Sequence, residues 1–100
     1  MDNEIQKAES PINLGNVYGS KGDIYLSAGE YSRALKMFEK ALALYQKAGH
    51  TVGVGNVYHR KGDICYYMGD DPGAFEMYEK ALVFFKKADQ LIGQGNMYKK

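Results

Sequence analysis

Residues 15–24 read GNVYGSKGDI and residues 55–64 read GNVYHRKGDI, so eight of ten positions recur after 40 residues. The first four letters return once more, with one change, at residues 95–98. Residues 12–51 align with residues 52–91 without a gap, and 17 of the 40 aligned positions are identical. Self-similarity at a fixed period indicates that one structural unit has been duplicated.

The duplication divides the chain into one array. Residues 12–51 form a first unit and residues 52–91 a second. Residues 92–100 match the start of a third unit, and residues 1–11 match the tail of a preceding one, because the letters QKA occur at both 6–8 and 46–48. We therefore expect two whole units flanked by partial ones, as in an excerpt of a longer array or a module that neighbouring chains complete.

Hydrophobic periodicity predicts two helices in each unit and no strand. The clearest helix covers about residues 31–48, and its counterpart, about 72–88, starts with Asp71 as N-cap and proline at the first helical position. The other helix of each unit is expected at about 13–28 and 52–68. The positions expected to face the core are Val17, Tyr18, Ile24, Tyr25, Tyr31, Ala34, Leu35, Phe38, Ala41, Leu42, Tyr45, Val57, Tyr58, Ile64, Cys65, Phe75, Tyr78, Ala81, Leu82 and Phe85.

Twelve glycines are many for a helical chain, because each glycine inside a helix costs about 1 kcal/mol relative to alanine. Seven of the twelve occupy equivalent positions in different units. Gly15, Gly22 and their counterparts fall within helices, where we expect a neighbouring helix to approach so closely that a Cβ would clash. Gly29 and Gly69 fall between helices, where a left-handed residue ends a helix.

Composition argues against several classes of function. Thirteen Lys and Arg nearly balance twelve Asp and Glu, whereas surfaces that bind nucleic acid or membranes need a cationic excess. No secretory signal and no membrane-spanning run is present, so we expect a cytoplasmic protein. His50, His59 and the single cysteine, Cys65, form no metal-ligand or catalytic pattern. We expect no enzyme and no cofactor, and an inert thiol at Cys65.

The units resemble tetratricopeptide repeats along essentially the whole chain. The matching residues are Tyr18, Gly22, Tyr25, Gly29, Tyr31, Ala34, Phe38, Ala41 and Leu42 in the first unit and Tyr58, Gly62, Gly69, Ala74, Tyr78, Ala81 and Leu82 in the second. The departures are Lys21 and Lys61 where the family has leucine, Cys65 in place of an aromatic residue, and Asp71 in place of Tyr31. The period of 40, instead of about 34, resembles a long-repeat subclass of scaffold and adaptor proteins.

This resemblance implies an all-α, right-handed superhelix, that is, a solenoid of antiparallel helical hairpins whose concave face binds a partner peptide or helix. The first helix of each unit lines that face. The groove positions of the family fall on Asn16, Gly19, Ser20, Asp23, Leu26 and Ser27 in the first unit, on Asn56, His59, Arg60, Asp63, Tyr66 and Tyr67 in the second, and on Asn96, Lys99 and Lys100 in the partial third unit. The residues we expect to contact the partner are Asn16, Asp23, Asn56, His59, Arg60, Asp63, Tyr66 and Tyr67. A known clamp of the family for a peptide's C-terminal carboxylate is not reproduced, because Asp23 and Asp63 stand where it has asparagine, and an acid would repel that carboxylate.

Three sets of residues need a choice between function and packing. The repeat does not require the pair at residues 66–67, which is Tyr-Tyr here and Leu-Ser in the first unit; it either contacts a partner or packs against the next unit. Asn16 and Asn56 either bind the backbone of a peptide or bond to the turn of a preceding unit. Tyr18 and Tyr58 are expected in the core between helices.

The leading hypothesis is a segment of a protein–protein interaction scaffold. The alternative is a structural spacer or a self-assembling repeat module with no ligand of its own. We also expect the chain to associate with itself through its end helices, because no following helix covers an apolar patch on the last helix. That patch comprises Leu91, Ile92, Met97 and Tyr98.

Overall fold

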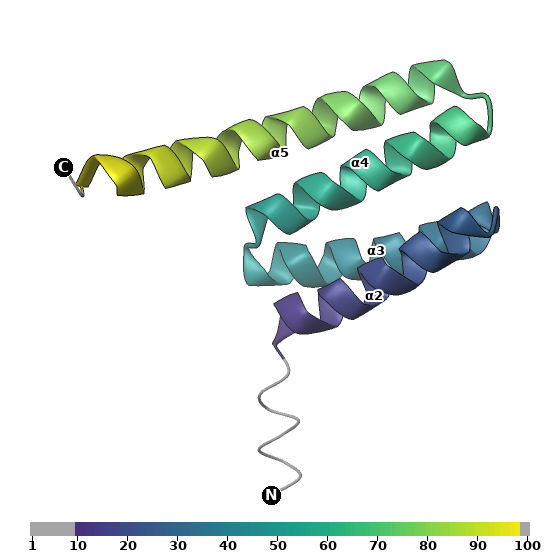
Figure 1. Ribbon diagram of the computed structural model, residues 1–100, viewed down its shortest axis with the longest axis horizontal. Helices are drawn as coiled ribbons and strands as arrows, with labels where there is room; N and C mark the ends of the chain where they lie inside the picture. The colour runs from purple at the N-terminus through teal and green to yellow at the C-terminus, as the bar shows by residue number, and fades with distance from the viewer. Residues whose placement is uncertain (1–9, 99–100) are drawn as a thin grey trace, which may run out of the picture.

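The computed structural model describes the backbone of residues 10–98 and the side chains of residues 10–91. The described residues form four helices and no strand: α2 (Pro11–Ser27), α3 (Tyr31–Ala48), α4 (Thr51–Tyr67) and α5 (Asp71–Tyr98). Helices α2 and α3 form one antiparallel hairpin, α4 and α5 form another, and the hairpins meet along α3 and α4 (Figure 1). The predicted all-α arrangement of stacked helical hairpins is confirmed, while the right-handed superhelix stays a prediction.

Two helix starts differ from the prediction. Helix α2 begins two residues early, because the Ser10 hydroxyl accepts a hydrogen bond from the Asn13 amide at 3.1 Å and Pro11 fits the first turn. Asp70 caps α5, and the prediction of Asp71 was wrong: the Asp70 carboxylate accepts a hydrogen bond from the Gly73 amide at 3.0 Å. The turn at Gly69 already places Asp70 beside the free amides of the first turn.

Three glycines end the first three helices in the same way. Gly29, Gly49 and Gly69 have φ angles of +77°, +66° and +84°, which a side chain would disfavour. At each turn the amide of the residue after the glycine donates to the carbonyl five residues earlier, as from Glu30 to Tyr25 at 2.9 Å. The predicted left-handed helix ends at Gly29 and Gly69 are confirmed.

Helix α5 does not break where the first unit breaks. We expected one helix to end near residue 88 and another to start at 92, but α5 is continuous from Asp71 to Tyr98. Asp89 stands where the first unit has Gly49, and an aspartate is less easily held in the left-handed conformation. The assignment of residues 92–100 to a third unit stays a prediction, and most of the tail assigned to a preceding unit, residues 1–11, lies outside the described residues.

Aromatic rings explain the glycines within the helices. A Cβ on Gly22 would lie 2.6 Å from the Phe38 ring, and one on Gly15 would lie 2.7 Å from the Tyr45 ring. The second unit repeats these pairs with Gly62 against Tyr78 and Gly55 against Phe85. The expected close approach is therefore confirmed, and the group that approaches is a ring from the second helix of the same unit.

Equivalent residues of the two units differ in burial. Val57 and Ile64 on α4 are 3% and 4% exposed, whereas their counterparts on α2, Val17 and Ile24, are 52% and 68% exposed. The reason is that α4 lies between α3 and α5, while among the described helices α2 packs mainly on α3. For the same reason Phe75 and Leu82 on α5 are 71% and 46% exposed. These four expected core positions are corrected to surface positions.

Other expected core residues lie at its margin. Tyr18 and Tyr58 are half-buried, and two lysine ammonium groups lie near each ring, as Lys21 and Lys40 do at 5.7 and 5.4 Å from the Tyr18 ring centroid. Lys21, which stands where the family has leucine, thus places its ammonium group near the Tyr18 ring. Of the patch expected on the last helix, Leu91 is exposed; its other three side chains lie outside the described part of the chain.

Two glycines on α2 give a matched test of this packing. Gly22→Ala should lower the free energy of unfolding by about 1–3 kcal/mol, because its Cβ would overpack against Phe38. Gly19→Ala should raise it by up to about 1 kcal/mol, because a Cβ there would meet only the Tyr45 hydroxyl, at 3.8 Å. Urea unfolding of both variants measures the difference, and effects of equal sign would contradict the packing.

Candidate partner-binding face

The side chains of α2 and α4 border two adjoining hollows on one side of the molecule, here called the α2/α4 face. The larger hollow, of about 620 Å³, is named the Gly19 hollow after the residue that leaves it open. Its remaining lining is Asn16, Ser20, Asp23, Phe38, Tyr45, Asn56, Val57, His59, Arg60 and Phe85. The smaller, of about 420 Å³, is named the Tyr31 hollow and is lined also by Leu26, Ser27, Gly29, Asp23, Arg60, Asp63 and Tyr67.

Most of the predicted site residues line these hollows. They are Asn16, Asp23, Asn56, His59 and Arg60 in the Gly19 hollow, and Asp63 and Tyr67 in the Tyr31 hollow. Tyr66 lines neither hollow; it is exposed, and its ring lies 5.7 Å from that of Tyr67. Phe38, Tyr45 and Phe85 also line the Gly19 hollow, although their repeat positions predicted only the core. Their positions opposite Gly22, Gly15 and Gly55 are the signal that would have located them.

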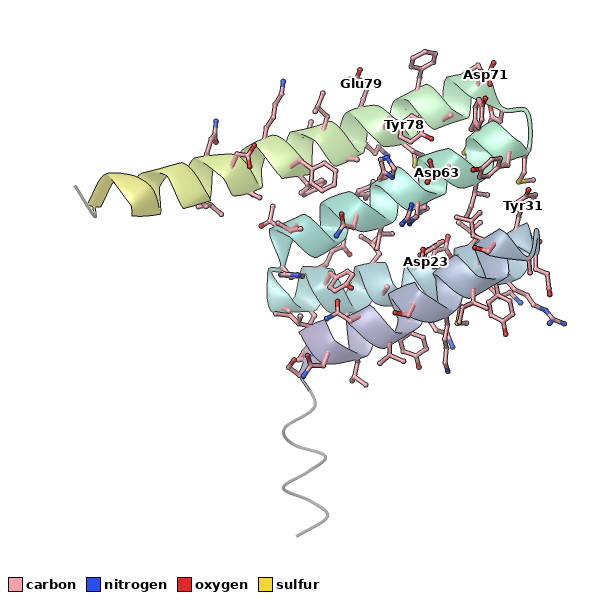
Figure 2. All side chains as sticks on the ribbon, in the orientation of Figure 1. Asp23, Tyr31, Asp63, Asp71, Tyr78 and Glu79 are labelled. Carbon is pink, nitrogen blue, oxygen red and sulfur yellow. The ribbon has the colours of Figure 1, made fainter. Side chains whose placement is uncertain are left out.

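Arg60 links the two helices that border the face. Its Nε lies 3.0 Å from Asp23 Oδ1 on α2, and its Nη1 lies 3.2 Å from Asp63 Oδ2 on α4. Figure 2 shows Asp23 and Asp63 on opposite sides of the space between the two hairpins. Because Arg60 and Asp23 are both partly exposed, the link contributes about 0–1 kcal/mol. The first unit has Ser20 at the position of Arg60.

The hydrogen bond between a tyrosine hydroxyl and the repeated asparagine is present in the first unit and absent from the second. Tyr45 donates a 2.5 Å hydrogen bond to Asn16 Oδ1 in the first unit. Its counterpart in the second unit is Phe85, which has no hydroxyl, so Asn56 lacks that bond. Asn16 therefore bonds within its own unit through Oδ1, which neither of the two sequence-based alternatives foresaw, whereas Asn56 receives no such tyrosine bond.

For the repeated aspartate the distribution is reversed: the second unit has the tyrosine donor and the first unit lacks it. The Tyr78 hydroxyl donates a 2.5 Å hydrogen bond to Asp63 Oδ1, whereas the counterpart of Tyr78 in the first unit is Phe38. Asp23 thus lacks a tyrosine donor and is paired with Arg60. His59 also approaches Asp63, with 3.6 Å between Nδ1 and Oδ2. Asp63 is therefore held by its own unit, while Asp23 is the more accessible carboxylate.

Burial and these contacts shift three pKa values. Burial and then the hydrogen bond to Asp63 raise the pKa of Tyr78 from 10.0 to about 12. Burial, followed by the charge of Asp23, raises the pKa of Tyr45. Burial also raises the pKa of the half-buried Cys65 thiol, with a further contribution from Asp70. A thiol with a raised pKa is a poor nucleophile at neutral pH, which supports the expectation of an inert cysteine.

Tyr67 packs against the preceding unit. Its ring stacks on that of Tyr31, with 6.2 Å between centroids and 11° between planes. The alternative that foresaw packing had placed this contact on the following unit. Both Tyr66 and Tyr67 remain more than half exposed, so their surfaces stay accessible to a partner.

The described part of the chain brings several kinds of binding group together. Among the side chains of residues 10–91, no three His, Cys, Asp or Glu residues gather as a metal site, and no described helix is long and apolar enough to cross a membrane. The Gly19 hollow combines aromatic rings at its base with amide, imidazole, guanidinium and carboxylate groups at its rim. Such a mixture suits recognition of a peptide segment.

Stacked hairpins of this kind define a helical-repeat protein. The chain belongs to the tetratricopeptide repeat family, whose model matches residues 12–87. Repeats of this family generally mediate protein–protein interactions and are typically not enzymes. A comparison with curated proteins found no match, and neither did one with solved structures. The long-repeat subclass stays a prediction.

The bond between Tyr78 and Asp63 predicts a pH dependence. Because the pKa of Tyr78 is raised on folding, its stabilisation is fully present below about pH 10 and is lost as the pH rises to about 12. Tyr78→Phe should lower the free energy of unfolding by about 1–3 kcal/mol at neutral pH, and the difference from the wild type should shrink across that window.

Urea unfolding at a series of pH values measures this difference. Tyr66→Phe is the control, because the Tyr66 side chain is exposed and its substitution should have little effect throughout. A Tyr78→Phe effect that stays constant as the pH rises would contradict the assigned bond.

Proposed function

We propose that the α2/α4 face binds an extended segment of a partner protein, and that the Gly19 hollow receives one of its side chains. The observation that carries this proposal is the openness of Gly19. Among the helical glycines of residues 10–91, only Gly19 would give a Cβ no contact closer than 3.8 Å. Packing therefore does not require glycine there, although glycine costs the helix about 1 kcal/mol. Its consequence is a hollow over the aromatic base.

The lining of the hollow suggests how the segment binds. An apolar side chain of the partner would contact the half-buried ring of Phe85, while the buried rings of Phe38 and Tyr45 form the floor beneath it. The Asn56 amide, which lacks the tyrosine bond that Asn16 receives, can bond to the partner's main chain. The carboxylates of Asp23 and Asp63 would repel a terminal carboxylate, so an internal segment fits better than a C-terminus.

The predicted site residues divide into three groups under this proposal. Asn56, His59, Arg60, Asp23 and Tyr67 are the proposed contacts with the partner. Asn16 and Asp63 are occupied by Tyr45 and Tyr78 and position their surroundings. Tyr66 lies beside the Tyr31 hollow, next to Tyr67, and would contact only a longer segment.

A selection from a random peptide library tests the proposal. Peptides selected on the wild-type chain should bind Gly19→His at least about tenfold more weakly, since a buried contact at a hot spot is worth about 1–2 kcal/mol or more. Histidine is chosen because the second unit carries His59 at this position. Asn56→Ala should weaken the same peptides, and Lys36→Ala, an exposed position on α3, should not.

Two outcomes would overturn the proposal. Peptides that bind Gly19→His as tightly as the wild type would place the binding site elsewhere. A selection that enriches no peptide would favour the alternative, in which the chain is a structural spacer without a ligand. Urea unfolding of Gly19→His should show unchanged or slightly raised stability, which separates loss of binding from loss of fold.

A further inference from the structure

The contact between the two hairpins indicates which kind of surface the outer face of α2, the side with Val17 and Ile24, can pack against. Val57 and Ile64 of α4 are buried in the core cluster shared with α3. Helix α2 presents Val17 and Ile24 at the equivalent positions, and in the described structure both are mostly exposed. Helix α4 uses this surface to pack against α3, the second helix of the first unit. The outer face of α2 carries the same kind of surface.

The outer face of α5 is the other half of the same contact. On α3, Leu35 and Leu42 pack against the core cluster and are partly buried. Their counterparts on α5 are Phe75 and Leu82, both of which are exposed. Helix α5 thus carries exposed apolar residues at the positions equivalent to those of α3, the helix on which α4 packs.

A charge pair recurs in the same register. Lys61 Nζ on α4 lies 4.0 Å from Glu39 Oε2 on α3, across the contact between the hairpins. The counterparts are Lys21 on α2 and Glu79 on α5. Figure 2 shows Glu79 on the side of α5 that faces away from α4. Neither Lys21 nor Glu79 forms an ion pair with the described residues.

We propose that a second copy of this chain stacks head to tail on the first, with α2 of one copy packed on α5 of the other as α4 packs on α3. In this register Val17 and Ile24 cover Phe75 and Leu82, and Lys21 pairs with Glu79. The two faces lie on opposite sides of the described helices, so the contact is heterologous and an assembly of these chains stays open and can grow.

This inference goes beyond the proposed function, because it uses the outer faces of α2 and α5 and leaves the α2/α4 face accessible. The proposed contact between copies differs in one respect from the contact between the two hairpins of one chain. The stacked pair Tyr31–Tyr67 has Asp71 and Ser27 as its counterparts. The contact between copies therefore lacks that aromatic pair and should be weaker than the contact between the units of one chain.

Light scattering on the 100-residue chain tests the stacking. The average mass of the wild type should rise with concentration beyond that of a dimer. Ile24→Asp and Phe75→Asp should each be monomeric alone, because each lacks one of the two faces. An equimolar mixture of them should form a dimer and nothing larger, because each variant supplies the face that the other lacks.

Two controls accompany this experiment. Both substituted side chains are mostly exposed in the single chain, so circular dichroism and thermal unfolding should show that the variants fold. Ala43→Asp makes a comparable change at an exposed position of α3 and should associate like the wild type. Lys21→Glu and Glu79→Lys should each weaken association a few-fold, and a chain with both substitutions should recover it.

Three results would overturn the inference. A wild type that stays monomeric up to high micromolar concentration would show that the faces do not attract a second copy, and peptide binding to the monomer would still be testable. Association of Ile24→Asp alone would indicate that two α5 faces meet instead. A mixture of the two variants that stays monomeric would exclude the head-to-tail register.

Discussion

The structure depends on aromatic rings of the second helix of each hairpin lying on glycines of the first. Phe38 on Gly22 and Tyr78 on Gly62 leave no space for a Cβ, so each pair fixes the distance and the register of its hairpin. Phe38 also lines the Gly19 hollow, and the Tyr78 hydroxyl bonds to Asp63, which lines the Tyr31 hollow. Packing and the proposed recognition therefore share residues, and a substitution at Gly22 is expected to disturb both. Gly19 is the exception, because nothing packs closely against it, and this is why the hollow above it can be closed without repacking the core.

Duplication produced two units with one backbone plan, but single exchanges give them different surfaces. A hydroxyl present on Tyr45 and absent from Phe85 occupies one asparagine and leaves Asn56 accessible. The reverse exchange between Phe38 and Tyr78 occupies Asp63 and leaves Asp23 to pair with Arg60. The polar groups offered to a partner thus follow from which unit carries each hydroxyl. A perfectly symmetric repeat would offer either every such group or none.

Residues that are identical in the two units lie in different environments, because a repeat protein is built along one direction and each unit contacts only its neighbours. Ile24 and Ile64 have the same side chain and the same place in a helix, yet one is mostly exposed and the other is buried. The difference arises because α3 covers this side of α4, whereas no described helix covers the equivalent side of α2. The surfaces left uncovered at the two ends are for this reason complementary to each other, and the contact between the hairpins supplies their geometry.

The sequence by itself determined the unit, the hairpins, the left-handed glycines at the turns and most of the residues that line the face, because these follow from periodicity, backbone conformation and repeat register, all of which are local. It did not determine that α5 would continue through Asp89, that the Tyr78 hydroxyl would bond to Asp63, or that Val17, Ile24 and Phe75 would be exposed. These outcomes depend on which side chains meet across helices and on which helix has a neighbour. Only the tertiary structure decides them, because a repeat position specifies the face that a residue presents and not the group that lies opposite it.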